Sequence, residues 1–251
     1  MKVSVITGVL NSPNTIEDSI RSVLNQSYKD IEHIIIDGGS CDGTLNTIYR
    51  YKDKIAKVVS EPDNGIYDAL NKGMRLASGD IISILHSDDF YAHNRIIEKV
   101  VDIFGRENVD SCYGDLEYIS KESPYRVIRY WKVSPYSEGK FKHGWMLPHP
   151  TFFVKKWVYD KYGYFNTDFK IAADYELMLR FLIKYRITTY YIPEVLIKMR
   201  IGGLSNRRFF RSWLIKSFED YRAWRVNGLK KDFFTILLKY LVKAPQFFRR
   251  I

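Results

Sequence analysis

The 251-residue sequence predicts an α/β fold: a mostly parallel sheet with helices on both faces, followed by a basic helical tail at the C-terminus. Three observations support this prediction. Over about the first hundred residues, short β-branched runs alternate with segments of helical apolar spacing. Four of the runs end in polar or glycine-rich loops, which parallel strands would bring to one edge of the sheet. Basic residues gather toward the C-terminal end.

The first part of the chain is predicted to form four strand–helix units. Each expected strand is rich in valine and isoleucine, and each expected helix repeats apolar residues every three or four positions. The strands are expected at residues 3–7, 31–36, 57–59 and 81–85. The helices are expected at residues 16–24, 45–49, 66–77 and 96–104. The loops that follow the four strands should therefore form one ligand site.

The pattern loosens from residue 110 onward. A strand is expected at residues 111–119, and loops with short strands are expected over residues 120–147, where prolines and glycines recur. The remaining expected elements are a strand at 150–154, a helix at 172–184, and two short strands at 187–192 and 195–200.

Composition indicates a globular protein with a core, because apolar residues make up 46% and charged residues 27% of the chain. The net charge of +10 is unevenly placed. Residues 207–251 hold 12 basic and 3 acidic residues, whereas residues 1–206 hold 27 and 26. Cys41 and Cys112 show no paired spacing, which favours a reduced, cytoplasmic protein. No signal peptide and no transmembrane run of about 18 apolar residues is expected.

Two adjacent aspartates, Asp88 and Asp89, follow the expected strand at 81–85 in the stretch HSDD. Paired carboxylates at a strand end suit a hard divalent cation, Mg²⁺ or Mn²⁺, which takes one or two carboxylates and fills its shell with phosphate oxygens and water. Alternatively, one of the aspartates caps the helix that follows. The residues alone leave both interpretations open.

Other candidate side chains have equally ordinary alternatives. Asp37 follows the second strand and either hydrogen-bonds a nucleoside or forms a turn. Asp174 begins a predicted helix and is either a general base or a favourable partner of the helix dipole. Glu176 lies about 200° away on helical spacing, so only one of these two acids should face the reaction. His149 and His86 are either functional or structural.

Taken in order, these motifs closely resemble family 2 glycosyltransferases of the GT-A fold. The stretches that carry the resemblance are SVLNQSY, DGGSCDGT, EPDNGIYDALNKG, ASGDIISILHSDD, HPTFF and AADYELMLR. The resemblance covers residues 1–206 and implies a Rossmann-like catalytic domain, with a nucleotide-binding half over about 1–110 and an acceptor half over about 111–206. The nearest branch contains bacterial enzymes of surface polysaccharide synthesis.

The resemblance implies roles on the donor side of the site. Asp37 would contact the nucleoside of a nucleotide-sugar donor, with a UDP-sugar favoured, and Thr7 and Asn11 would lie near the base and ribose. Three further residues would help to close the nucleotide pocket: Asp63, Asn71 and Lys72. Many members of the family have a second aspartate where this chain has Gly38, and this departure leaves the choice of nucleobase open.

The resemblance also implies the chemistry. Asp88 and Asp89 match the family's metal motif, with Asp89 the stronger candidate for direct coordination of Mn²⁺ or Mg²⁺. Asp174 matches the base that deprotonates the acceptor hydroxyl, and His149 and Glu176 fall on the acceptor side. A single base with in-line attack implies inversion at the anomeric carbon. His86 stands where the family has aspartate or asparagine, so its role stays open.

The basic tail has aromatic and aliphatic residues at helical spacing, flanked by lysine and arginine. Such a helix is typical of an element that lies in the plane of a membrane surface, where each basic residue contributes about 1 kcal/mol near anionic lipid. Residues 207–251 are therefore expected to hold the enzyme on the inner face of the cell membrane, near a lipid-linked acceptor. Alternatively, the tail packs on the catalytic domain or forms a homodimer contact.

Other classes of protein fit the sequence less well. A nucleic-acid-binding protein would use the basic tail, but it gives no reason for the acidic residues at one sheet edge, so no nucleic-acid partner is expected. A sugar nucleotidyltransferase would bind the same kinds of ligand, yet the loop TGVLNSPN has no basic residue for a phosphate. A non-catalytic relative is disfavoured because Asp88, Asp89 and Asp174 are all present.

Overall fold

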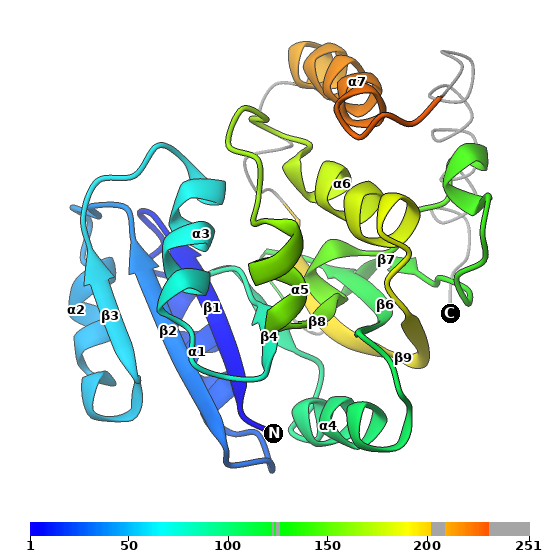
Figure 1. Ribbon diagram of the computed structural model, residues 1–251. Coiled ribbons are helices and arrows are strands. Elements are labelled where there is room, and N and C mark those ends of the chain that lie inside the picture. The colour runs from blue at the N-terminus through cyan, green and yellow to red at the C-terminus, as the bar shows by residue number, and fades with distance from the viewer. Residues whose placement is uncertain (122, 124–125, 202–208, 231–251) are drawn as a thin grey trace.

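The computed structural model describes residues 1–121, 123, 126–201 and 209–230, with side chains left out for residues 209–214 (Figure 1). Within these residues, nine strands form one mixed sheet in the order β3-β2-β1-β4-β8-β6-β9-β5, and β7 pairs with β6. In Figure 1 the blue and cyan strands form one side of the molecule, and the green and yellow strands form the other. The predicted α/β fold class is confirmed.

The parallel half of the sheet follows the predicted strand–helix order. Its strands are β1 (Val3–Val9), β2 (Ile31–Asp37), β3 (Lys57–Ser60) and β4 (Ile81–Ile84). Its helices are α1 (Ile16–Leu24), α2 (Thr44–Tyr49), the short η1 (Lys52–Lys54), α3 (Ile66–Leu76) and α4 (Ile96–Arg106). The strands pair in parallel, so their carboxyl ends lie at one edge.

Strand β2 shows why helices cover both faces of this sheet. Ile34 and Ile36 point to one face and belong to the main core with residues of α3, whereas Ile35 points to the other face and packs with residues of α1 and α2. Gly73 lets α3 approach closely, because a Cβ at this position would overlap the side chain of Ile6 in β1. The apolar run Ile34–Ile36 within β2, with successive side chains buried on opposite faces, is typical of a strand covered on both faces.

The second half differs from the prediction in its details. Its strands are β5 (Asp89–Tyr91), β6 (Ser111–Ile119), β7 (Val127–Trp131), β8 (Phe153–Lys155) and β9 (Thr189–Arg200). Its helices are η2 (Lys140–His143), η3 (His149–Thr151), α5 (Lys156–Tyr162) and α6 (Ala173–Met178), with a π-helical turn η4 (Leu179–Lys184). Strand β8 pairs antiparallel with β4 and β6, which turns the parallel sheet into a mixed one.

Prolines account for two of these differences. The expected strand at 150–154 begins instead as the η3 turn, since Pro150 has no N–H to give to a sheet ladder. The two strands expected at 187–192 and 195–200 are one strand, β9, with a bulge at Pro193 and Glu194. The chain rejoins the same partner, β6, beyond the bulge.

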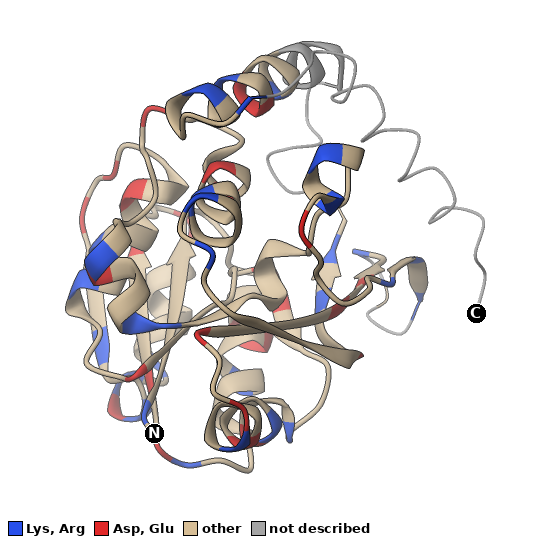
Figure 2. Cartoon of the chain, turned by 45° about the vertical axis from the view of Figure 1, so that its right-hand side comes forward, with Lys and Arg blue, Asp and Glu red and all other residues tan. Residues whose placement is uncertain are grey.

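Helix α7 (Phe209–Val226) packs against α6, and Figure 1 shows it above α6 in orange. Basic and acidic positions both occur along it, as Figure 2 shows. The rest of the expected tail, residues 207–208 and 231–251, lies outside the described residues, and a domain boundary near residue 206 stays a proposal. No helix among the described residues is long and apolar enough to cross a bilayer.

A buried carboxylate at the amino end of the parallel strands ties three elements together. Glu32 of β2 is 5% exposed and accepts hydrogen bonds from Ser4 of β1 and from Ser78 and Gly79, which precede β4. Lys2 forms an ion pair with it at 2.9 Å. Burial works to raise the pKa of this carboxyl, but the hydrogen bonds outweigh burial and lower the pKa to about 2.

We expect the substitution Glu32→Gln to lower the free energy of unfolding by about 3 kcal/mol at pH 7. A carboxyl with a lowered pKa in the folded state stabilises the fold above its ordinary pKa of 4.5 and loses this contribution as the pH falls toward 2. The difference between the variant and the wild type should therefore shrink between pH 5 and pH 2. Urea unfolding across this range measures it, with the exposed Glu138→Gln as control, and a constant difference would contradict the assignment.

Candidate functional site

Hydrogen bonds link the loops at the carboxyl edge of the parallel strands. The loop after β1 contacts the loop after β2, because Cys41 N donates to Asn11 Oδ1 at 3.1 Å. It also contacts the loop after β4, where the hydroxyls of Ser87 and Ser12 are 3.2 Å apart. The predicted meeting of polar loops at one edge is therefore present.

Asp37 ends β2 and is fully buried. Its Oδ2 accepts hydrogen bonds from the backbone N–H groups of Gly39 (3.1 Å) and Ser40 (3.0 Å) and from Ser60 Oγ (2.7 Å). Its Oδ1 has no hydrogen-bond partner among the described residues. One oxygen thus forms the expected turn, and the other remains available to a ligand.

Asp63 lies next to Gly38 in space, on the loop after β3. Its Oδ1 accepts a hydrogen bond from Gly65 N at 2.8 Å. A Cβ at position 38 would overlap the Asp63 carboxylate, so any larger residue there would require the Asp63 side chain to move. Lys72 points to the same loop and pairs with Glu61 at 2.9 Å.

Thr7 and Asn11 use their polar groups within the protein. The Thr7 hydroxyl is buried and hydrogen-bonds His33 Nε2 at 2.9 Å. Asn11 adopts a positive φ of 50°, which asparagine tolerates better than most residues. Its predicted contact with a nucleotide, like that of Thr7, stays a prediction.

Asn71 joins the two halves of the molecule. Its amide nitrogen donates to Phe165 O and its amide oxygen accepts from Phe165 N, both at 2.9 Å. The ring of Phe165 in turn packs edge-on against the imidazole of His149, with ring centres 5.4 Å apart. Asn71 therefore positions the acceptor-side segment, and its predicted part in a nucleotide pocket stays a prediction.

Asp88 and Asp89 do not cap the following helix. Helix α4 has Arg95 at its N-cap position and no side-chain cap, so the capping alternative is wrong. Asp89 begins β5 and is fully buried, and neither oxygen of its carboxylate has a hydrogen-bond partner among the described residues. Burial first, and then the charge of Asp88, raise the pKa of Asp89 well above its usual range.

These two carboxylates fit a cation that takes few ligands from protein. The described residues contain no group of three or more histidine, cysteine or acidic side chains arranged for a metal ion. A hard divalent cation that binds phosphate needs only one or two carboxylates. Asp89 supplies two buried oxygens with no other partner, which is the property expected of such a ligand.

Two histidines lie with Asp174 near this pair. Burial lowers the pKa of His86, while the charges of Asp88 and Asp174 act to raise it. Burial also lowers the pKa of His149, to about 4, against the charge of Asp174. His86 therefore lies close to both the aspartate pair of the β4 loop and the acid at the start of α6. Both imidazoles are neutral near pH 7 on this basis.

Glu176 points away from this cluster. It is 3% exposed, its Oε2 pairs with Arg180 at 3.0 Å, and its Oε1 accepts from Asn227 Nδ2 at 3.0 Å. Asp174 and Glu176 thus separate as helical spacing predicts. The acceptor-side role of Glu176 stays a prediction, and both of its oxygens are already engaged.

The arrangement of loops and acids is matched by the sequence model of Glycosyl transferase family 2, which covers residues 4–164. An uncharacterized glycosyltransferase of Mycobacterium tuberculosis is 35% identical over 181 residues, covering 71% of this chain and 68% of the relative. The chain belongs to glycosyltransferase family 2.

Two solved structures confirm the GT-A fold of this glycosyltransferase. TarS 1–349 of S. aureus, in complex with UDP-GlcNAc, matches this chain with a TM-score of 0.70 at 16% sequence identity. The match covers 91% of this chain and 66% of the TarS chain. The mannosyltransferase PcManGT from Pyrobaculum calidifontis, in complex with GDP-Man and Mn²⁺, has a TM-score of 0.65 at 19% identity. That match covers 97% of this chain and 70% of PcManGT.

The sequence did not single out Arg200, the last residue of β9. It is 7% exposed, donates to Asp88 O at 3.1 Å, pairs with Asp18, and lies over the Phe90 ring at 5.1 Å. Its charge acts to lower the pKa of Asp89, against the larger effects that raise it. The available signal was an arginine at the end of the strand expected at residues 195–200.

Two tyrosines of the glycosyltransferase were also missed. Tyr67 donates its hydroxyl to Ile171 O at 2.8 Å, and burial, with the charge of Asp174, raises its pKa. Burial likewise raises the pKa of Tyr118, on which the charges of Asp89 and Asp174 both act. Tyrosine is common in this chain, so composition could not mark these two.

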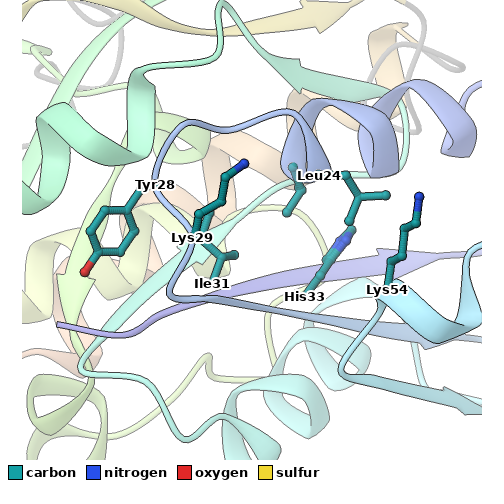
Figure 3. A pocket seen from close by; sticks show the side chains of 7 residues that line it. Leu24, Tyr28, Lys29, Ile31, His33 and Lys54 are labelled. Atoms are coloured by element: carbon teal, nitrogen blue, oxygen red, sulfur yellow. The ribbon is translucent and has the colours of Figure 1, made fainter.

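A shallow pocket of about 180 Å³ lies away from the candidate site (Figure 3). Its lining comes from the end of α1, the start of β2 and η1: Val23, Leu24, Tyr28, Lys29, Ile31, His33 and Lys54. None of the predicted site residues lines it. Because Ile31 is the first residue of β2, this pocket belongs to the opposite end of the strand from Asp37 and is not part of the glycosyltransferase site.

Proposed function

We propose that the protein transfers a sugar from a nucleotide-diphosphate donor, with a UDP-sugar favoured, to a hydroxyl group of a glycan acceptor, in a metal-dependent reaction that inverts the anomeric carbon. One observation carries the proposal. The charges of both Asp88 and Asp174 act on His86, so the acid expected to act on the leaving group and the acid expected to act on the acceptor lie within electrostatic range of one side chain.

The donor side of the proposal rests on the loops at the carboxyl edge. TarS and PcManGT, which share the fold, are seen with UDP-GlcNAc and GDP-Man. The Oδ1 of Asp37, which has no hydrogen-bond partner among the described residues, would accept a hydrogen bond from a nucleoside, and Asp63 lies beside the next residue, Gly38. Nucleotide ligands typically bind at this edge of open parallel sheets.

Asp89, with Asp88 beside it, would hold Mn²⁺ or Mg²⁺. A divalent cation supplies charge neutralisation as the nucleoside diphosphate leaves. The complex of PcManGT contains Mn²⁺, which supports the same choice here. Arg200 fixes the backbone of the aspartate pair through Asp88 O, so the carboxylates are held in place before any ligand arrives.

On the acceptor side, Asp174 would accept the proton from the attacking hydroxyl. Its Oδ1 takes one hydrogen bond, from Tyr175 N at 2.8 Å, which leaves acceptor capacity for a substrate hydroxyl. His86 and His149 are neutral near pH 7 and so do not compete with it by charge. Attack by a hydroxyl on the face opposite the leaving diphosphate would invert the anomeric carbon.

The acceptor is proposed to be lipid-linked, as in bacterial surface polysaccharide synthesis, with the enzyme resting on the inner face of the membrane. The outer face of α7 supports this because it exposes three apolar side chains, Ile215 (45%), Phe218 (68%) and Val226 (46%). Large exposed apolar side chains on a helix with basic neighbours are typical of a membrane-surface element.

The substitution Asp89→Ala tests the metal ligand. We expect the affinity for UDP in the presence of Mn²⁺ to fall by about 2 kcal/mol or more, roughly 30-fold, because the cation loses its buried carboxylate. Stability without metal should change little, since neither oxygen of Asp89 has a hydrogen-bond partner among the described residues and burial disfavours its charge. Calorimetry with UDP and Mn²⁺ measures the binding, and the exposed Asp53→Ala is the control. Undiminished binding removes Asp89 from the metal site.

The substitution Asp174→Asn tests the base. It removes the proton acceptor with almost no change in volume, so donor binding should persist while the turnover number of transfer falls about 10²-fold or more. Single-turnover transfer assays with a panel of nucleotide sugars measure this, and Asp160→Asn on α5 is a matched control. If Asp174→Asn stays active and Glu176→Gln is inactive, the two roles are reversed.

The membrane proposal is tested by co-sedimentation with anionic vesicles. Phe218→Glu should weaken binding about tenfold, because an exposed ring that enters the lipid surface is replaced by a charge. Tyr49→Glu on α2, an exposed aromatic far from α7 in Figure 1, should leave binding unchanged. High salt should release part of the bound protein. Absence of wild-type binding at low salt would exclude the proposal.

A further inference from the structure

The inner face of α7 contacts the segment that carries Asp174. The carboxylate of Glu219 accepts hydrogen bonds from three consecutive backbone N–H groups: Lys170 (2.8 Å), Ile171 (2.9 Å) and Ala172 (2.8 Å). Glu219 is 6% exposed, so water does not substitute freely for these contacts. The last of the three donors lies two positions before Asp174.

Helix α7 also holds the residues that follow Asp174. Trp224 Nε1 donates to the hydroxyl of Tyr175 at 3.0 Å, in a buried contact. Asn227, the residue directly after α7, donates its Nδ2 to the carboxylate of Glu176 at 3.0 Å. One helix, nearly fifty residues further along the chain, therefore fixes the backbone before Asp174 and the side chains after it.

The segment has no local group that could do this work. Helix α6 starts after Ala172, which makes no side-chain cap, and the N–H groups ahead of a helix need acceptors when they are buried. A charged acceptor makes stronger hydrogen bonds than a neutral one and holds its donors in narrower geometry. Glu219 thus supplies from a distance what the local sequence lacks.

We propose that Glu219 is a positioning residue for proton removal by Asp174. By fixing residues 170–172, it sets where the Asp174 carboxylate lies relative to His86 and the acceptor hydroxyl. A displacement of about 1 Å in a reacting group can lower a rate about 10²-fold, so this placement matters for turnover. The inference rests on the proposed role of Asp174 as base.

The first test is Glu219→Gln, which keeps the shape of the side chain. The amide oxygen of glutamine can still accept hydrogen bonds from some of the three N–H groups. The amide NH₂ replaces the second acceptor with a donor, so the remaining N–H groups lose their hydrogen bonds. We expect the turnover number of transfer to fall about tenfold or more with the donor KM unchanged. Glu138→Gln, an exposed carboxylate on the protein surface, is the matched control for loss of one negative charge. An unchanged turnover number overturns the proposal.

A double substitution separates positioning from general support of the fold. If Glu219 acts through Asp174, adding Glu219→Gln to Asp174→Asn should cause no further loss of turnover. Losses that multiply would show an independent role and overturn the inference. Amide hydrogen exchange should rise in the peptide covering residues 170–176 and nowhere else, and a rise across the whole domain would mean that Glu219 only stabilises the fold.

Trp224→Phe provides the same test if Glu219→Gln does not fold. This variant removes one indole N–H and keeps most of the buried ring, so a smaller fall in turnover with an unchanged donor KM is expected. The outcomes also separate this inference from the proposed function. An active Asp174→Asn would remove the base itself, whereas an inactive Asp174→Asn beside fully active Glu219→Gln and Trp224→Phe would remove only the positioning role.

Discussion

The hydrogen bonds of Glu32 fix the frame on which the site is built. This one carboxylate connects β2 to β1 and to the turn that enters β4, so it sets the alignment of three adjacent parallel strands at their amino ends. Because these strands pair in parallel, a register that is fixed at their amino ends is also the register at their carboxyl ends. The loops that carry Asp37 and Asp89 therefore start from a common edge because the strands are locked at the far edge.

Buried carboxylates in this protein differ in how fully the fold satisfies them. Glu32 and Glu219 each accept several hydrogen bonds, and both serve the architecture. Asp37 has one satisfied oxygen and one free, and Asp89 has neither oxygen satisfied among the described residues. A buried charge without partners costs free energy, and groups perturbed in this way gather at functional sites. The degree of satisfaction thus separates the structural acids from the candidate functional ones.

The sequence predicted the parallel half well because its strands contain short runs of valine and isoleucine, such as Ile34–Ile36 in β2, separated by segments of helical spacing. The second half was harder because its order depends on contacts between distant residues. The bulge at Pro193 looks like a strand end until β6 is seen on both sides of it. The local sequence could not show whether Asp89 caps a helix or begins a strand. Strand β5, which starts at Asp89, forms by pairing with the distant strand β9. Arg200 and Glu219 act across long sequence separations for the same reason.

The expectation of a separate basic tail needs the most revision in physical terms. Phe218 and Glu219 are neighbours in α7, about 100° apart around the helix. The side chain of Phe218 is exposed, whereas that of Glu219 is buried against the segment of Asp174. Deleting the tail would remove the acceptor of three consecutive backbone N–H groups together with any surface that meets a membrane. Attachment and catalysis can therefore be separated only by substitutions that change one face of α7 and leave the other intact.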